Sequence, residues 1–87
     1  MSDTNGAPRR TFADVVANPP EGWRVGVVLD AGETVRFDHG DAAFVWFSLV
    51  TGSGSEGVYA RTPAKRKAAA YRAVADLLDL LAEVSDV

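Results

Sequence analysis

The chain has 87 residues, enough for one domain with a single core but too few for two. It contains no cysteine, which excludes a disulfide framework and a thiolate nucleophile and favours a cytoplasmic location. The net charge of −3 disfavours diffuse attraction to nucleic acid or to anionic lipid. No stretch reaches the roughly 18 apolar residues of a membrane span, so no membrane contact is expected.

The N-terminal part predicts a tail followed by a short helix. Residues 1–10 are mostly small and polar, and we expect a mobile tail there, ahead of a single α+β domain over 11–87. Thr11 is typical of an N-cap, and Asp14 stands three residues later, where Glu or Gln would complete a capping box. A two-turn helix is therefore expected over 11–17.

The next segment predicts a β-hairpin. Residues 23–29 alternate strongly enough for a strand, 34–38 form its return, and 30–33 make the turn. Alternation places Arg36 on the outer face. The side chains expected on the inner face are Trp23, Val25, Val27, Leu29, Val35 and Phe37.

The run 43–50 holds three of the chain's six Phe and Trp residues, and we expect it to be a middle strand of the sheet. Side chains alternate between the two faces of a strand. The two resulting sets are Val45, Phe47 and Leu49 on one face, and Phe44, Trp46 and Ser48 on the other.

A glycine- and serine-rich segment follows. We expect a flexible loop over 51–57 and a short fourth strand over 58–61. The letters from Gly52 to Gly57 match G-x-G-x-x-G, a pattern of dinucleotide-binding loops. Such a loop must open directly into a helix that receives the pyrophosphate, whereas 58–61 intervenes here. No cofactor is therefore expected.

The C-terminal segment predicts one long helix of roughly residues 63–84. Thr62 suits an N-cap, and Pro63 suits the first helical position, where its missing N–H would have no partner anyway. Apolar side chains recur at three- and four-residue spacing and are expected to lie on the sheet. They are Ala70, Val74, Leu77, Leu78, Leu81 and Val84.

These elements predict an α+β fold in α-β-β-β-α order. A three- or four-stranded antiparallel sheet packs against the long C-terminal helix, with a short N-terminal helix beside it.

The charges of the last helix run against its dipole. Its basic residues come early and its acidic residues late: Lys65, Arg66, Lys67 and Arg72, then Asp76, Asp79, Glu83 and Asp86. Each such charge destabilises a helix by about a few tenths of a kcal/mol, so helix stability does not explain the order. Either the early cations hold a phosphate at the helix start, or they are good helix formers on a solvated face. We favour the second interpretation.

The only histidine, His39, stands between aspartates in a turn. Hydrolytic zinc sites use three protein ligands, and a nucleophilic relay needs a positioned Ser or Cys. Turn chemistry explains the neighbouring Asp and Gly residues without a reaction. We therefore expect no metal site, no catalytic residue and no enzyme activity.

The order of a short helix, three strands and a final helix that begins Ala-Lys-Arg-Lys resembles double-stranded RNA-binding domains. The resemblance spans about residues 11–82 in outline and only the start of the last helix in detail. In that family the lysines there grip phosphates across a groove, which implies this role for Lys65, Arg66 and Lys67. The family's Gly-Pro-x-His turn is replaced here by the acidic segment 30–33.

The outer face of the sheet is the main functional indication. Aromatic side chains interleaved with arginine are what interfaces prefer, so we expect a non-enzymatic binding module for a protein partner or a second copy of the chain. The expected contact residues are Arg24, Arg36, Phe44, Trp46 and Tyr59.

Two alternatives stay open at this stage. The first is a nucleic-acid-binding module in which Arg24 and Arg36 act with phosphate contacts of the last helix and the residues before it. The candidates for phosphate contact are Arg61, Lys65, Arg66 and Lys67. The second is that the short helix over 11–17 folds over the Trp46 face and makes it ordinary core.

Overall fold

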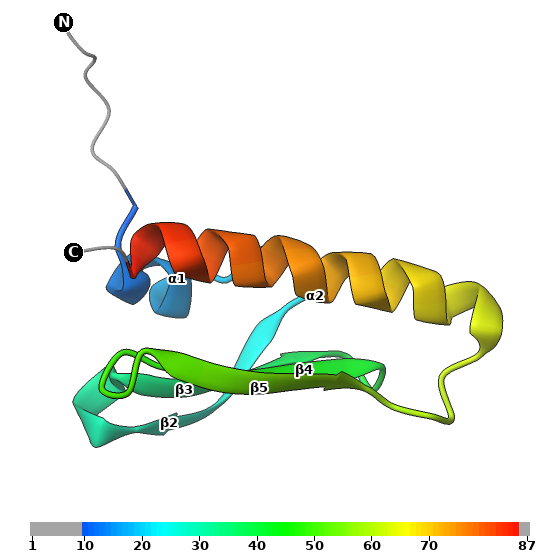
Figure 1. Cartoon of the computed structure of the whole chain (residues 1–87), viewed down its shortest axis with the longest axis horizontal. Helices are drawn as coiled ribbons and strands as arrows, with labels where there is room; N and C mark the ends of the chain where they lie inside the picture. Colours follow the sequence, from blue (N-terminus) through cyan, green and yellow to red (C-terminus); the bar gives the residue numbers. More distant parts are fainter. Residues whose placement is uncertain (1–9, 86–87) are drawn as a thin grey trace, which may run out of the picture.

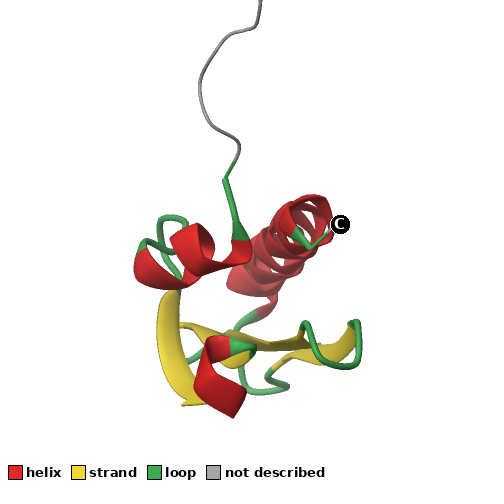
Figure 2. Ribbon diagram, turned by 90° about the vertical axis from the view of Figure 1, so that its left-hand side faces the viewer, coloured by secondary structure: helices red, strands yellow, loops and turns green. Residues whose placement is uncertain are grey.

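A computed structural model describes residues 10–85, so the tail expected over 1–10 lies almost entirely outside the described residues. The elements follow in the order α1 (Phe12–Ala17), β2 (Arg24–Leu29), η1 (Asp30–Gly32), β3 (Thr34–His39), β4 (Ala43–Ser48), β5 (Ser53–Val58) and α2 (Ala64–Val84). The four strands form one antiparallel sheet in the order β2-β3-β4-β5. The predicted α+β fold is confirmed, with four strands in the sheet. Both α helices lie on the same side of it (Figures 1 and 2).

The core lies between this side of the sheet and the helices. Its largest fully buried side chains come from α1, β3, β4 and α2, and are Val15, Val35, Phe37, Val45, Leu77 and Leu81. Each such apolar side chain contributes about 1.5–3 kcal/mol when fully buried. The predicted stripe on α2 is confirmed, because Ala70 and Val74 are buried with the two leucines while Leu78 and Val84 pack partly against the core.

The short helix α1 begins with the capping box that the sequence suggests. The backbone N–H of Thr11 donates to Asp14 Oδ2 at 2.9 Å, and the N–H of Asp14 donates to Thr11 Oγ1 at 3.2 Å. Two otherwise unpaired donors of the first turn are thus satisfied. Phe12 is buried, and its ring centroid lies 5.7 Å from that of Phe47 in β4. The helix α1 therefore covers the end of the sheet beside α2.

A bulge changes the orientation of the first strand. The register of β2 against β3 shifts between Val25 and Val27, with Gly26 as the extra residue. The expected inner position of Val27 and Leu29 is wrong, because one extra residue reverses the alternation beyond it. A Cβ atom on Gly26 would collide with the carboxylate of Asp38, so a residue without a side chain suits the bulge.

The middle strand is shorter than expected. β4 ends at Ser48, whereas the sequence predicts a strand over 43–50. Leu49 lies in the following turn, where its N–H donates to the carbonyl of Glu33 at 2.8 Å and its side chain is 37% exposed. The expected place of Leu49 on the inner face of the strand is therefore wrong.

The fourth strand lies where a flexible loop is expected. β5 covers Ser53–Val58, so the expected loop over 51–57 and strand over 58–61 are both wrong. The turn before β5 closes when the Gly52 N–H donates to the Ser48 carbonyl at 2.9 Å. Gly52 has a φ of 69°, a conformation that glycine adopts without strain.

The other glycines of this segment serve close approach to β4. A Cβ atom on Gly54 would collide with the Trp46 carbonyl, and one on Gly57 would stand 2.9 Å from Cε1 of Phe44. Glycine inside a strand often marks such a contact. The composition that resembles a flexible loop therefore permits tight strand pairing.

The long helix α2 begins one residue later than expected. Pro63 is its N-cap and makes no side-chain capping bond, so the N-cap expected at Thr62 is wrong. Thr62 is buried instead, and its hydroxyl donates to the Ala42 carbonyl at 3.4 Å. This bond ties the β5–α2 connection to the turn before β4. Neither α helix described here is long and apolar enough to cross a membrane.

Candidate binding surface

The side of the sheet away from the helices carries the candidate surface. Neither α1 nor α2 lies on it, as Figure 2 shows. Since Phe12 of α1 packs against Phe47, α1 lies on the opposite side from Phe44 and Trp46. The alternative in which residues 11–17 cover Trp46 is therefore wrong.

Strand register brings the predicted contact residues together on this side. Trp46 is directly opposite Arg36, and Phe44 is directly opposite Asp38. Asp38 is in turn opposite Arg24 of the first strand. We call this surface the open face, defined by Arg24, Arg36, Asp38, Phe44, Trp46 and the contacting Tyr59.

Arg36 is the centre of the open face. Its Nε donates to Asp38 Oδ1 at 2.8 Å, and its Nη2 donates to the Tyr59 hydroxyl at 2.8 Å. Its guanidinium carbon lies 5.1 Å from the centre of the Phe44 ring, within cation–π range. The hydrogen bond that Arg36 donates to the Asp38 carboxylate raises the pKa of Arg36 above its ordinary value. Arg36 is therefore charged and held in one orientation by three neighbours.

The aromatic rings continue this arrangement towards the end of β5. The rings of Phe44 and Tyr59 are tilted at 38° with centroids 5.8 Å apart, and Arg61 lies 5.5 Å from the centre of Tyr59. Gly57 leaves room for the Phe44 ring above it. The two rings thus lie between two cations, in the order Arg36, Phe44, Tyr59, Arg61, and these contacts orient both aromatic side chains without a covering layer.

Trp46 differs from its neighbours on the open face. It is partly buried, between Arg36 on one strand and Ser55 on the next. Among residues 10–85 its ring joins no aromatic or cation–π pair, and its indole N–H donates no hydrogen bond. A Trp N–H usually finds a partner when it is fully buried. Trp46 therefore offers both an apolar ring and a hydrogen-bond donor to a ligand.

The candidate phosphate contacts do not form one site. Arg61 joins the open face, whereas the residues 65–67 begin α2 on the other side of the sheet. Lys67 Nζ donates to the Ala60 carbonyl at 3.3 Å, while Lys65 is exposed.

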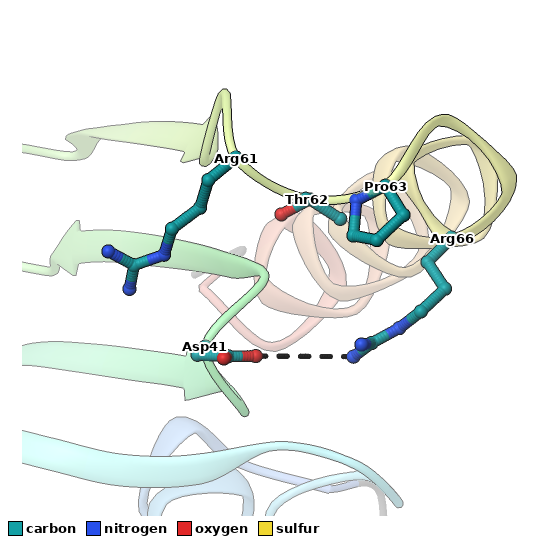
Figure 3. A pocket seen from close by; sticks show the side chains of 5 residues that line it. All are labelled: Asp41, Arg61, Thr62, Pro63 and Arg66. Atoms are coloured by element: carbon teal, nitrogen blue, oxygen red, sulfur yellow. Dashed lines mark ion pairs between the residues drawn. The ribbon is translucent and has the colours of Figure 1, made fainter.

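A hollow of about 110 Å³ separates Arg61 from Arg66 at this end of the molecule. In Figure 3 the Arg66 side chain reaches towards Asp41, whereas the Arg61 side chain extends over the sheet and away from Arg66. Arg66 Nη2 lies 4.0 Å from Asp41 Oδ1. The Asp41 carboxylate would repel a phosphate in this hollow, which disfavours an anion site there.

His39 packs against another ring. Its centroid lies 4.9 Å from that of Trp23 in an edge-on arrangement. Within the described part of the chain, no group of three His, Cys, Asp or Glu residues could hold a metal ion.

Two features of the open face are missing from the sequence-based prediction. Asp38, which orients Arg36, is placed there at the end of the strand over 34–38 and explained by turn chemistry, but it is not expected among the contact residues. Val27 and Leu29, which join this side beyond the bulge, are 38% and 50% exposed. Gly26 inside an alternating run was the available signal for that bulge.

Comparison with known proteins finds no family model, no curated protein and no solved structure that matches this chain. The function must therefore be argued from the geometry of the open face.

Proposed function

We propose that the protein is a non-enzymatic binding module whose open face binds an acidic and partly apolar surface of another protein. The observation that carries this proposal is the group of aromatic side chains Phe44, Trp46 and Tyr59 on a sheet face that neither α1 nor α2 covers, with Phe44 and Tyr59 held by arginines. Aromatic residues and arginine are enriched at the centres of protein interfaces. Arg36 and its neighbours hold two of the rings in place, which reduces the entropy lost on binding.

The charge of the open face indicates which partner fits. Arg24, Arg36 and Arg61 contribute three positive charges there, against one negative charge from Asp38. The whole chain has a net charge of −3, so this positive surface is local. Complementary charge favours an acidic partner. A second copy docked by the same face would bring arginines against arginines, which disfavours self-association there.

Single-stranded nucleic acid is the second candidate. Arginines beside exposed aromatic rings support it, because bases stack on such rings and phosphates pair with such cations. The separation of residues 65–67 from the open face weighs against the binding mode of double-stranded RNA-binding domains. Binding of this kind would weaken steeply with salt.

Selection of displayed random peptides on the immobilised protein tests the proposal. We expect the enriched peptides to combine Asp or Glu with apolar residues. Trp46→Ala and Arg24→Glu should weaken their binding by about tenfold or more, as removal of central contacts does. Arg66→Glu is the matched control, because it makes the same charge change on the other side of the sheet and should leave binding unchanged.

Two results would contradict the proposal. One is an absence of enriched peptides, or peptides that bind all variants equally. The other is binding of single-stranded RNA or DNA oligonucleotides at about 50 mM salt that Arg24→Glu abolishes, which would establish the second candidate instead.

A further inference from the structure

We propose that the chain also forms an antiparallel homodimer, in which β5 pairs with β5 of a second copy and α2 packs beside the second α2. This interface is separate from the open face. It would join two four-stranded sheets into one sheet of eight strands, with the two open faces continuous on one side.

The outer edge of β5 is open to strand addition. All six residues of β5 pair with β4 without a register shift, and the Tyr59 N–H donates to the Ala42 carbonyl at 2.8 Å. The backbone N–H and C=O groups of Tyr59 therefore point towards β4. Because this direction alternates along a strand, the backbone groups of Gly54, Glu56 and Val58 point away from β4. No described strand lies on that side of β5.

The two edges of the sheet differ in protection. The edge strand β2 carries the bulge at Gly26, which interrupts regular pairing, and Arg24 at its start. β5 contains no bulge, proline or lysine, and among the features that protect a sheet edge it has only the single charge of Glu56. Its backbone is therefore the better template for another strand.

The position of α2 matches such a dimer. The helix contacts β4 and β5, and it runs beside β5 in the opposite direction (Figure 1). In such a dimer the twofold axis is perpendicular to the sheet and passes midway between the two β5 strands. Neighbouring strands are about 4.8 Å apart, so a helix centred over β4 and β5 lies roughly 5 Å from this axis. Two such helices would be about 10 Å apart, which is within the usual distance for packed helices.

The side of α2 that would face the second copy is apolar. A groove of about 420 Å³ runs between α2 and β5. Tyr71, Ala75 and Leu78 line it from the helix together with Val74, and Glu56, Gly57 and Val58 line it from the strand. Tyr71 is 58% exposed. Tyr71, Ala75 and Leu78 of a second copy would close the groove by symmetry.

The charge order of α2 identifies a second copy as the occupant. Its N-terminal half is basic and its C-terminal half is acidic, against the helix dipole. In an antiparallel pair each basic half lies beside the acidic half of the other helix. Arg72 and Asp79 stand about one turn before and after Ala75, so a twofold axis near Ala75 places Arg72 at the same level along the helix pair as the Asp79 of the other copy.

Sedimentation velocity of the full chain from micromolar to millimolar concentration tests the dimer. We expect a dimer whose dissociation constant rises at least tenfold in Glu56→Pro, which removes an outward N–H, and in Arg72→Asp. The double variant Arg72→Asp with Asp79→Arg should restore the dimer, because the exchanged charges still match across the twofold axis. Circular dichroism confirms that each variant is folded, and a misfolded variant would not be rescued.

Trp46→Ala separates this inference from the proposed function, because it should leave the dimer intact. A wild-type chain that stays monomeric at millimolar concentration would overturn the inference. So would a dimer unaffected by both Glu56→Pro and Arg72→Asp, failed rescue by the charge exchange, or a dimer broken by Trp46→Ala.

Discussion

The two faces of the central hairpin β3–β4 use similar residues in different ways. On the covered face, Val35, Phe37 and Val45 have no exposed surface and belong to the core that the sheet forms with α1 and α2. On the open face, Phe44 and Trp46 are only partly buried, and Phe44 is supported from the side by Arg36. An aromatic strand residue can therefore be ordered by lateral cation contacts as well as by a core. The first arrangement stabilises the fold, and the second leaves a surface for a partner.

The largest expected effect is on the covered face. Phe37→Ala should lower the free energy of unfolding by about 3–5 kcal/mol, because a fully buried ring leaves a cavity. A domain of this size has only about 5–10 kcal/mol in total, so the variant should be close to unfolded at room temperature. Urea denaturation followed by circular dichroism measures the change. A loss below about 1 kcal/mol would show that this face is not the core.

The corresponding change on the open face should be smaller. Trp46→Ser should lower the free energy of unfolding by roughly 1–2 kcal/mol, since the ring is only partly removed from water in the wild type. Urea denaturation of Trp46→Ser and Phe37→Ala under the same conditions compares the two losses in the free energy of unfolding directly. Equal losses in the two variants would mean that Trp46 belongs to a core and would remove the distinction between the faces.

The hydroxyl of Tyr59 allows a test of how Arg36 supports the aromatic side chains of the open face. Tyr59→Phe removes the acceptor of the bond from Arg36 Nη2 but keeps the ring on Phe44. We expect a loss of about 1 kcal/mol in the free energy of unfolding. In Arg36→Met the bond is already absent, so adding Tyr59→Phe should change little. An equal loss in both backgrounds would show that the hydroxyl does not act through Arg36.

The smallest expected effect concerns the edge of the covered face. Thr11→Ala removes the side-chain acceptor of the α1 capping box and should lower the free energy of unfolding by about 0.5 kcal/mol. Thermal unfolding by calorimetry detects such a change. Thr51→Ala is a matched control, because its hydroxyl lies in an exposed turn and caps no helix. A larger loss in the control would contradict the role of the cap.

Local patterns predicted the elements that depend on neighbouring residues. The spacing of Ala70, Val74, Leu77 and Leu81 placed α2 and its buried stripe correctly, and Thr11 with Asp14 marked the start of α1. Phe44 and Trp46 were also placed correctly on the face of the strand away from the core, because they alternate with buried neighbours. These features depend on helical and strand periodicity, which a short segment expresses by itself.

The sequence-based prediction missed features that depend on contacts between one strand and the next. β5 has the composition of a flexible loop, and only the close approach of Gly54 to Trp46 and of Gly57 to Phe44 explains why those glycines belong in a strand. The bulge at Gly26 reverses β2 because of its pairing with β3. In both cases the contact is made with the neighbouring strand of a hairpin, so the pattern of one strand alone does not show it.

The sequence by itself determined an α+β fold with an apolar α2 stripe and an aromatic strand that has two usable faces. Only the tertiary structure decided that α1 joins α2 on one face, and that Arg36 is held by Asp38 and Tyr59 on the other. The physical reason is that periodicity is a property of one segment, whereas coverage of a face depends on where the whole chain packs. Phe12 settles that choice through its contact with Phe47, a residue 35 positions away in the chain.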